Sequence, residues 1–182
     1  MLGLKRGTVK LISHNPEWAS LFAEEKARLN TALGERALDI QHMGSTSIPG
    51  LVAKPILDIA IAIADVVNIT ECVPLLEALG YQYFGDRYGK DDFLFVKGNE
   101  ESRTHHIHMP THLGLEWTTM LRLRDYLIAS PEAQQRYSDL KRRLYLQHSG
   151  NRMAYTAGKD AFIECLLREA FSESVLRNGQ ED

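Results

Sequence analysis

A small turn rich in hydrogen-bond donors is the segment best suited to chemistry, and its residues are Gly44, Ser45, Thr46 and Ser47. Glycine lets a ligand come close to the backbone, while hydroxyl and backbone N–H groups can donate to phosphate oxygens. Asp58 follows within the apolar run 55–63, which has the composition of a buried strand. A carboxylate there could hold Mg²⁺ beside the same phosphates. The pattern therefore predicts a phosphate site next to a metal-binding acid.

The same residues allow a structural interpretation, in which the turn caps its own backbone and Asp58 makes a structural hydrogen bond. Short motifs of this kind often occur by chance. An acid inside an apolar strand favours function, because a buried charge without a partner is costly. Phosphoryl transfer through two metal ions usually needs a second acid, however, and Ala60 stands where that acid is expected. The residues alone leave both interpretations open.

A second group consists of three histidines within four residues, His105, His106 and His108. On a strand, His106 and His108 project from one face and His105 from the other. The pair could ligate a transition metal, or it could contact Asp58 if the two strands are neighbours. The alternative is one histidine packed in the core while the others solvate a strand edge. A closed zinc site is not expected, because no cysteine lies nearby.

A third group is basic and comprises Lys54, Arg87, Lys90, Lys97 and Arg103. Lys54 lies four residues before Asp58 and could neutralise a phosphate, although a surface lysine before a proline is the simpler interpretation. Tyr155 and Lys159 are spaced by one helical turn and would share a helix face, a spacing that chance explains equally well.

The elements that must position these residues alternate in the first part of the chain and are helical in the last third. Apolar stretches predict strands at 9–12, 38–43, 56–63, 81–84, 93–96 and 105–109. Apolar stripes and capping residues predict helices at 16–33, 70–79, 115–129, 132–148 and 155–177. We expect a single domain over 1–182, with an α/β core at 1–112 and a helical part at 113–182 packed on it.

Whole-chain properties narrow the class of protein. The 182 residues suit one domain, and 44% hydrophobic with 25% charged residues is an ordinary globular composition. A net charge of −3 argues against a general nucleic-acid or anionic-membrane binder. The first residues lack the apolar core of a signal peptide, and no apolar stretch reaches the ~20 residues of a membrane span. We therefore expect a cytoplasmic protein whose partners include neither membrane nor nucleic acid.

The segment from His42 to Ile59, with its Gly-Ser-Thr-Ser, Pro-Gly-Leu and Lys-Pro steps, resembles the signature of the GrpB family (UPF0157). The resemblance extends over nearly the whole chain, through His-Asn-Pro-Glu-Trp at 14–18 and Leu-Arg-Asp-Tyr-Leu at 123–127. It also includes residues 103–108, Tyr155 and residues 159–163. A string of this length is far more specific than a bare Gly-Ser pair.

The resemblance implies membership of the nucleotidyltransferase (polymerase-beta-like) superfamily. The implied fold is α+β, a mixed sheet flanked by helices with a helical C-terminal part. In that superfamily the glycine-serine turn holds a nucleotide triphosphate, which gives this role to Gly44 and Ser45. Asp58 matches the first acid of a metal-binding pair, and Ala60 does not match the second. The third acid would lie on the strand that carries the histidines.

Three hypotheses follow. The leading one is an enzyme that moves a nucleotidyl or phosphoryl group onto a small molecule, with Asp58, His106 and His108 as catalytic residues and ligands of one Mg²⁺ or Mn²⁺. Its phosphate-binding residues would be Gly44, Ser45, Thr46, Ser47, Lys54, Arg103 and Lys159. The second is a catalytically silent nucleotide-binding or regulatory module, which the missing acid at position 60 supports. The third is a hydrolase or metal-binding protein that uses the aspartate–histidine set with a transition metal.

Overall fold

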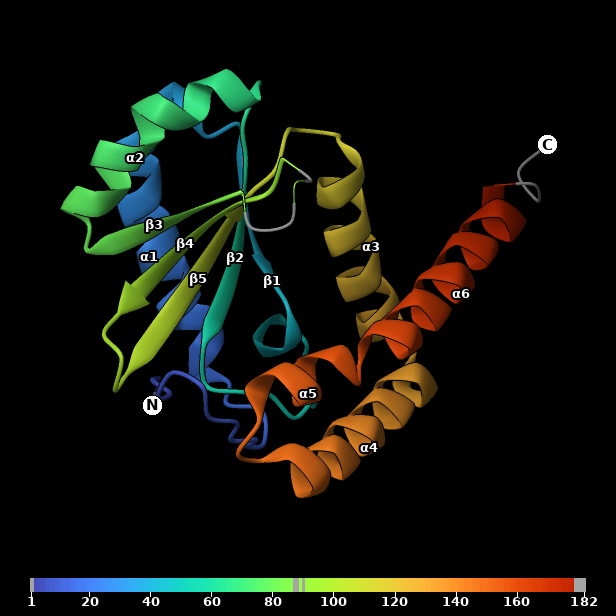
Figure 1. Cartoon of the computed structure of the whole chain (residues 1–182). Coiled ribbons are helices and arrows are strands. Elements are labelled where there is room, and N and C mark those ends of the chain that lie inside the picture. The colour runs from blue at the N-terminus through green and yellow to red at the C-terminus, as the bar shows by residue number, and fades with distance from the viewer. Residues whose placement is uncertain (1, 87–88, 90, 179–182) are drawn as a thin grey trace.

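The computed structural model describes residues 2–86, 89 and 91–178, with side chains described as far as residue 172. The strands in these residues are β1 (Asp39–Met43), β2 (Leu57–Ala62), β3 (Tyr81–Asp86), β4 (Phe93–Gly98) and β5 (Arg103–Met109). The helices are α1 (Glu17–Leu33), α2 (Ile69–Ala78), α3 (Leu115–Ala129), α4 (Pro131–His148), α5 (Arg152–Ala157) and α6 (Asp160–Asn178). Helices α1 and α2 lie on one side of the sheet, and α3 to α6 lie on the other (Figure 1).

The strands form one mixed sheet in the order β1-β2-β5-β4-β3, in which β2 and β5 run parallel and the other neighbours are antiparallel. The register of β2 with β5 places Asp58 opposite His106 and Ala60 opposite His108. Because alternate residues of a strand point to opposite faces, these four side chains share one face of the sheet. His105 belongs to the other face, as its position in the sequence predicts.

The face toward α1 and α2 carries an extensive apolar cluster. Its fully buried members include Leu29, Leu33, Ile59, Ile61, Leu76, Phe95 and Ile107. On the opposite face, Ala60 and Ala62 of the same strand are also fully buried. Strand β2 is therefore covered on both sides, which explains why its sequence is an almost unbroken apolar run rather than an alternating one.

Helix α3 covers the β1–β2 end of the second face. Its Trp117, only 4% exposed, packs against Ala60 and Ala62. Further along the same helix, Arg124 Nη1 donates to Gln41 Oε1 (3.0 Å) and to the backbone oxygen of His42 (3.1 Å). The helix thereby holds the end of β1 in place just before the chain enters the turn at 44–47.

The other C-terminal helices pack around the segment that follows this turn. Ile48 and Leu51 are buried in one cluster with residues of the helical part, Leu127, Tyr137, Leu140, Leu144, Tyr155 and Leu166. The apolar spacing along α4 predicts such a packed face. The turn is consequently held between the sheet on one side and the helical part on the other.

The expected α+β class with a helical C-terminal part is confirmed. The helices and strands predicted between 16 and 148 are present, with ends shifted by two residues or fewer. The strand predicted at 9–12 is wrong, because this segment makes only an isolated bridge from Ile12 to Ala53. No helix among the described residues combines the length and apolar character needed to cross a bilayer.

The single helix predicted at 155–177 is also wrong, because α5 and α6 are separate helices. Gly158 lies between them, and a Cβ there would stand 2.6 Å from Leu144 Cδ2 of α4. The junction can therefore pack closely on α4 only if residue 158 has no side chain. Lys159 follows at once and is presented at the junction rather than along a continuous helix.

Candidate functional site

Asp58 and His106 form a direct pair on adjacent parallel strands. His106 Nδ1 lies 3.1 Å from Asp58 Oδ1, and the two residues are opposite each other in the register of β2 and β5. Burial alone would raise the pKa of Asp58, but the hydrogen bond from His106 and the charges of His106 and Lys54 outweigh it and bring this pKa to about 2. Asp58 is therefore a carboxylate across the physiological range.

The pairing determines the state of the imidazole. Burial lowers the pKa of His106, although Asp58 opposes that shift, so the ring is neutral at pH 7. Since Nδ1 of His106 faces a carboxylate, we assign the ring proton to Nδ1, which leaves the free lone pair on Nε2. Nε2 is buried and has no hydrogen-bond partner among the described residues. The pair thus presents an oriented, unprotonated nitrogen of the kind that accepts a proton in acid–base catalysis.

The turn at 44–47 packs directly against Asp58. Gly44 has φ +67° and ψ −168°, a conformation that essentially only glycine adopts, and a Cβ there would stand 2.6 Å from Asp58 Oδ2. Ser47 Oγ donates to the backbone oxygen of Gly44 (2.7 Å), and Thr46 Oγ1 contacts His42 Nε2 (3.0 Å). Thr46 and Ser47 therefore stabilise the turn itself, while Ser45 faces the charged groups described next.

Lys141 of α4 completes the turn and was missed from the sequence. Its Nζ donates to Ser45 Oγ (2.5 Å) and to the backbone oxygen of Val52 (2.8 Å), and the residue is only 2% exposed. Burial holds the pKa of Lys141 well below its usual range, helped by the charges of Lys159 and Lys54. A sequence signal did exist, because Lys141 lies at helical spacing between the apolar Tyr137 and Leu144, where a solvated lysine is not expected.

Lys54 and Lys159, together with Lys141, form what we call the lysine cluster. Burial and the charge of Lys159 lower the pKa of Lys54 to about 8, although Asp58 opposes the shift. Burial also lowers the pKa of Lys159, again against the effect of Asp58. The charge of Arg152, from α5, contributes to lowering both values. Asp58 thus opposes the effect of burial on the pKa of all three lysines, while Arg152 acts on Lys54 and Lys159. Basic side chains from separate segments gathered around one carboxylate are suited to binding an anion.

His108 lies on the same face as His106 but has a different partner. Its Nδ1 is 2.7 Å from Oδ2 of Asp92, a buried residue whose Oδ1 has no hydrogen-bond partner in the part of the chain that the structure describes. The structure thus brings Asp58 and His106 together and places His108 in a second aspartate–histidine pair. Asp92 was not predicted, because nothing in the sequence around it distinguishes it from an ordinary acid in a turn.

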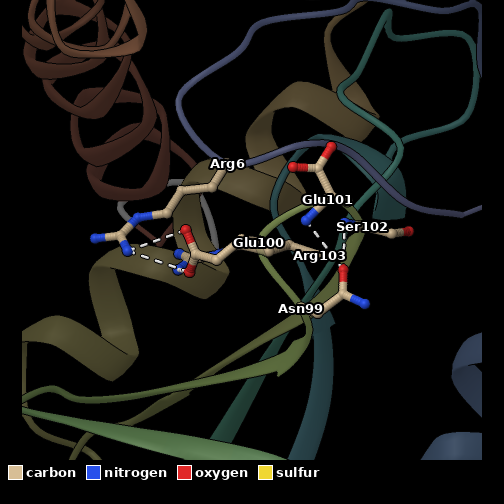
Figure 2. A network of polar contacts seen from close by, with 6 residues as sticks. All are labelled: Arg6, Asn99, Glu100, Glu101, Ser102 and Arg103. Atoms are coloured by element: carbon tan, nitrogen blue, oxygen red, sulfur yellow. Dashed lines mark hydrogen bonds and ion pairs between the residues drawn. The ribbon is translucent and has the colours of Figure 1, made fainter.

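Arg103 is bonded to Glu100, and its role in phosphate binding stays a prediction. Its Nη2 donates to Glu100 Oε1 (3.1 Å), and Arg6 Nη1 contacts both carboxylate oxygens of Glu100 at 3.1 Å (Figure 2). Lys97 instead pairs with Glu25 of α1, with 2.7 Å between Nζ and Oε1. Of the other basic residues in the predicted group, Arg87 and Lys90 fall outside the described residues.

The donor set does not fit a resident divalent metal ion. Mg²⁺ prefers octahedral oxygen coordination and usually one or two carboxylates. Here Asp58 is hydrogen-bonded to His106, its neighbours are lysines, and position 60 carries an alanine beneath Trp117. No three His, Cys, Asp or Glu side chains in the described part of the chain are grouped so as to hold a metal. The assignment of Asp58, His106 and His108 to one metal stays a prediction that the geometry does not favour.

Comparisons with known proteins agree on one family. Residues 8–169 match the family model described as GrpB protein. The chain is 34% identical over 173 residues to the glutamate-rich protein GrpB of Alkalihalophilus pseudofirmus, covering 93% of this chain and 99% of that protein. It is 36% identical over 156 residues to the UPF0157 protein YqkA of Bacillus subtilis, covering 86% of this chain and 45% of that protein.

A solved structure shows the same fold. The crystal structure of the conserved protein GrpB from Enterococcus faecalis superposes with a TM-score of 0.84 at 31% sequence identity. The match covers 91% of this chain and 99% of that one. The α/β core and the helical part are therefore both within the shared fold.

The packing of Trp117 on Ala60 predicts that the missing acid cannot simply be restored. We expect Ala60→Asp to lower the free energy of unfolding by about 3 kcal/mol, because it buries a carboxylate in the apolar contact with Trp117, while Nδ1 of the facing His108 is already bonded to Asp92. Urea denaturation measures the change. The same substitution at the exposed Ala23 of α1 is the matched control and should cost about 0.5 kcal/mol or less. Equal losses in the two variants would contradict this account of position 60.

The conformation of Gly44 predicts a second stability effect. We expect Gly44→Ala to destabilise the protein by about 2–4 kcal/mol, because alanine strains the backbone at φ +67° and collides with Asp58. Gly150→Ala is the control, since a Cβ at that position meets no atom within 4 Å. Urea denaturation of both variants distinguishes the outcomes. A Gly44→Ala variant as stable as Gly150→Ala would show that the turn does not depend on the close approach.

Proposed function

This chain belongs to the GrpB family, and from that premise we propose that it binds a phosphorylated small molecule such as a nucleotide and transfers a nucleotidyl or phosphoryl group from it. The observation that supports this proposal most strongly is the lysine cluster beside the turn and Asp58. The charges of its three lysines act on one another and on Asp58, and Asp160 is a further acid that acts on Lys159, so the site holds more lysines than acids. A polyanion such as a di- or triphosphate would supply the missing negative charge.

The proposed chemistry assigns separate tasks to the two parts of the site. Ser45 and the neighbouring backbone N–H groups would bind phosphate oxygens, and the lysine cluster would stabilise negative charge that develops on the leaving phosphate. On the acceptor side, His106 Nε2 would take the proton of an attacking hydroxyl group, which requires the packing around this buried atom to open when the ligand binds. Asp58 would hold the ring in the required tautomer and stabilise the imidazolium that forms. Asp58 and His106 would therefore be the catalytic residues. His108 is bonded to Asp92, and its charge helps to lower the pKa of Asp58.

A second candidate, a catalytically silent nucleotide-binding module, is favoured by one observation. Trp117 covers Ala60, so the place of a second metal-binding acid is occupied by an apolar contact. A module of this kind would keep the lysine cluster and lose turnover. The third hypothesis, a hydrolase that uses a transition metal, is less well supported, because His108 pairs with Asp92 rather than with Asp58 and His106.

Turnover distinguishes the enzyme from the silent module. We expect the protein to release pyrophosphate from a nucleoside triphosphate when supplied with a mixture of small-molecule hydroxyl acceptors. Asp58→Asn should reduce the rate by about 100-fold or more, because His106 loses the carboxylate that orients its ring. Asp139→Asn, at an exposed position of α4, is the matched control and should leave the rate unchanged. Equal rates for wild type and Asp58→Asn would rule out the proposed enzyme.

The lowered pKa of Lys54 predicts that anion binding depends on pH. Lys54 loses its proton as pH rises through about 8, so the site has less positive charge at pH 9 than at pH 7. We expect the affinity for inorganic triphosphate, measured by calorimetry, to fall about 10-fold over this interval. The charged groups that act on the pKa of Lys54 are Lys159, Asp58 and Arg152. The pKa of Lys159 is also lowered, so loss of its proton adds to the fall in affinity.

Lys54→Gln is the control for this pH dependence. It should bind triphosphate more weakly than wild type at pH 7 and should show a smaller loss between pH 7 and pH 9. A wild-type affinity that is the same at both pH values would contradict the role of Lys54.

A further inference from the structure

The carboxylates of this site are too few for the metal ions that phosphoryl transfer commonly employs. Two-metal transfer relies on several acids that clamp both ions. Here one side chain, Asp58, faces the turn, and Ala60 lies under Trp117. Asp92, which immediately precedes β4, is bonded to His108.

The surroundings of Asp58 are electrostatically unfavourable for a cation, although its side chain is 30% exposed. Its Oδ1 accepts a hydrogen bond from His106, and its Oδ2 lies so close to Gly44 that a Cβ there would stand 2.6 Å away. A divalent ion placed beside the carboxylate would also meet the charges of the lysine cluster and Arg152. Like charges in a partly buried site repel strongly.

The positive charge that a metal would bring is already supplied by side chains. Lys141 is fixed beneath the turn by Ser45 Oγ and the oxygen of Val52, and it comes from α4. Lys54 lies in the segment before β2, and Lys159 lies at the junction of α5 and α6. The three lysines therefore come from separate segments of the chain, and their charges act on Asp58 together, as side chains that bind a phosphate group would.

We propose that the lysine cluster takes the place of the divalent metal ion, so that this site binds the phosphate groups of its ligand as a metal-free anion. The inference rests on the proposed function, since it specifies the charged form of the ligand for that same site. A polyphosphate complexed with Mg²⁺ has less negative charge and brings a cation to a site that already contains several basic side chains. Magnesium should therefore weaken binding or leave it unchanged, rather than being required for it.

The test uses the full chain, inorganic triphosphate as the probe, and calorimetry at pH 7. One series contains EDTA, and the other contains Mg²⁺ in excess over the probe. We expect binding in EDTA to be at least as tight as in Mg²⁺. Lys159→Gln should weaken binding in EDTA about 10-fold, because a charge-assisted contact is lost. Lys10→Gln, at an exposed position, is the matched control and should bind as wild type does.

The outcomes separate this inference from the proposed function. Binding that appears only with Mg²⁺ would overturn the metal-free site and leave the phosphate-binding function intact. Absence of binding in both series would overturn both. Binding in EDTA that Lys159→Gln and Lys10→Gln weaken equally would also overturn the inference, because the effect would then come from net charge alone. Lys159 is substituted rather than Lys141, because Lys159 is partly exposed and Lys141 is buried. Replacing a partly exposed lysine disturbs folding less than replacing a buried one.

Discussion

One carboxylate in a strand covered on both faces sets the requirements for much of this structure. The charge of Asp58 needs compensation, and the fold supplies it from several directions. His106 donates from the neighbouring strand, and the lysine cluster adds positive charge from the segment before β2 and from the helical part. The turn must bring a glycine against the carboxylate, since a side chain at position 44 would collide with it. A single charge thus constrains residue types in distant parts of the chain.

The lysine cluster contains more basic side chains than are needed to stabilise the carboxylate of Asp58, and the additional lysines bear on the function of the site. Lysines held near one another repel, and burial of Lys141 adds a further cost. A protein selected for stability alone would not retain such a cluster, since buried ionic groups are replaceable by apolar ones. The energetic cost is understandable if a ligand offsets it, because a bound anion would relieve the repulsion. The site would then resemble other functional sites, where local instability is tolerated for binding.

The sequence predicts the α/β core well, because β2, β5 and α1 have strong local patterns. The parity of His105, His106 and His108 on a strand already separates them between two faces. The lysine cluster could be predicted only in part, because Lys141 and Asp58 are brought together by tertiary packing and not by spacing. Arg103 is a different case: its basic side chain favours phosphate binding in the sequence, whereas in the structure it donates a hydrogen bond to the nearby Glu100. The break at Gly158 depends on Leu144 of another helix, which no local pattern reveals.

The hydrogen bond between Lys141 and Ser45 joins residues 96 positions apart in the chain. Contacts of such separation form slowly, since a long loop must close before they contribute any stability. Asp58 and His106, by contrast, are brought together by the pairing of β2 with β5 inside the sheet. A molecule whose helical part is undocked would therefore lack the ammonium group beneath the turn even with the sheet in place. Anion binding is in this sense a property of the completed fold, and a ligand that binds there would favour the docked arrangement of both halves over any folding intermediate.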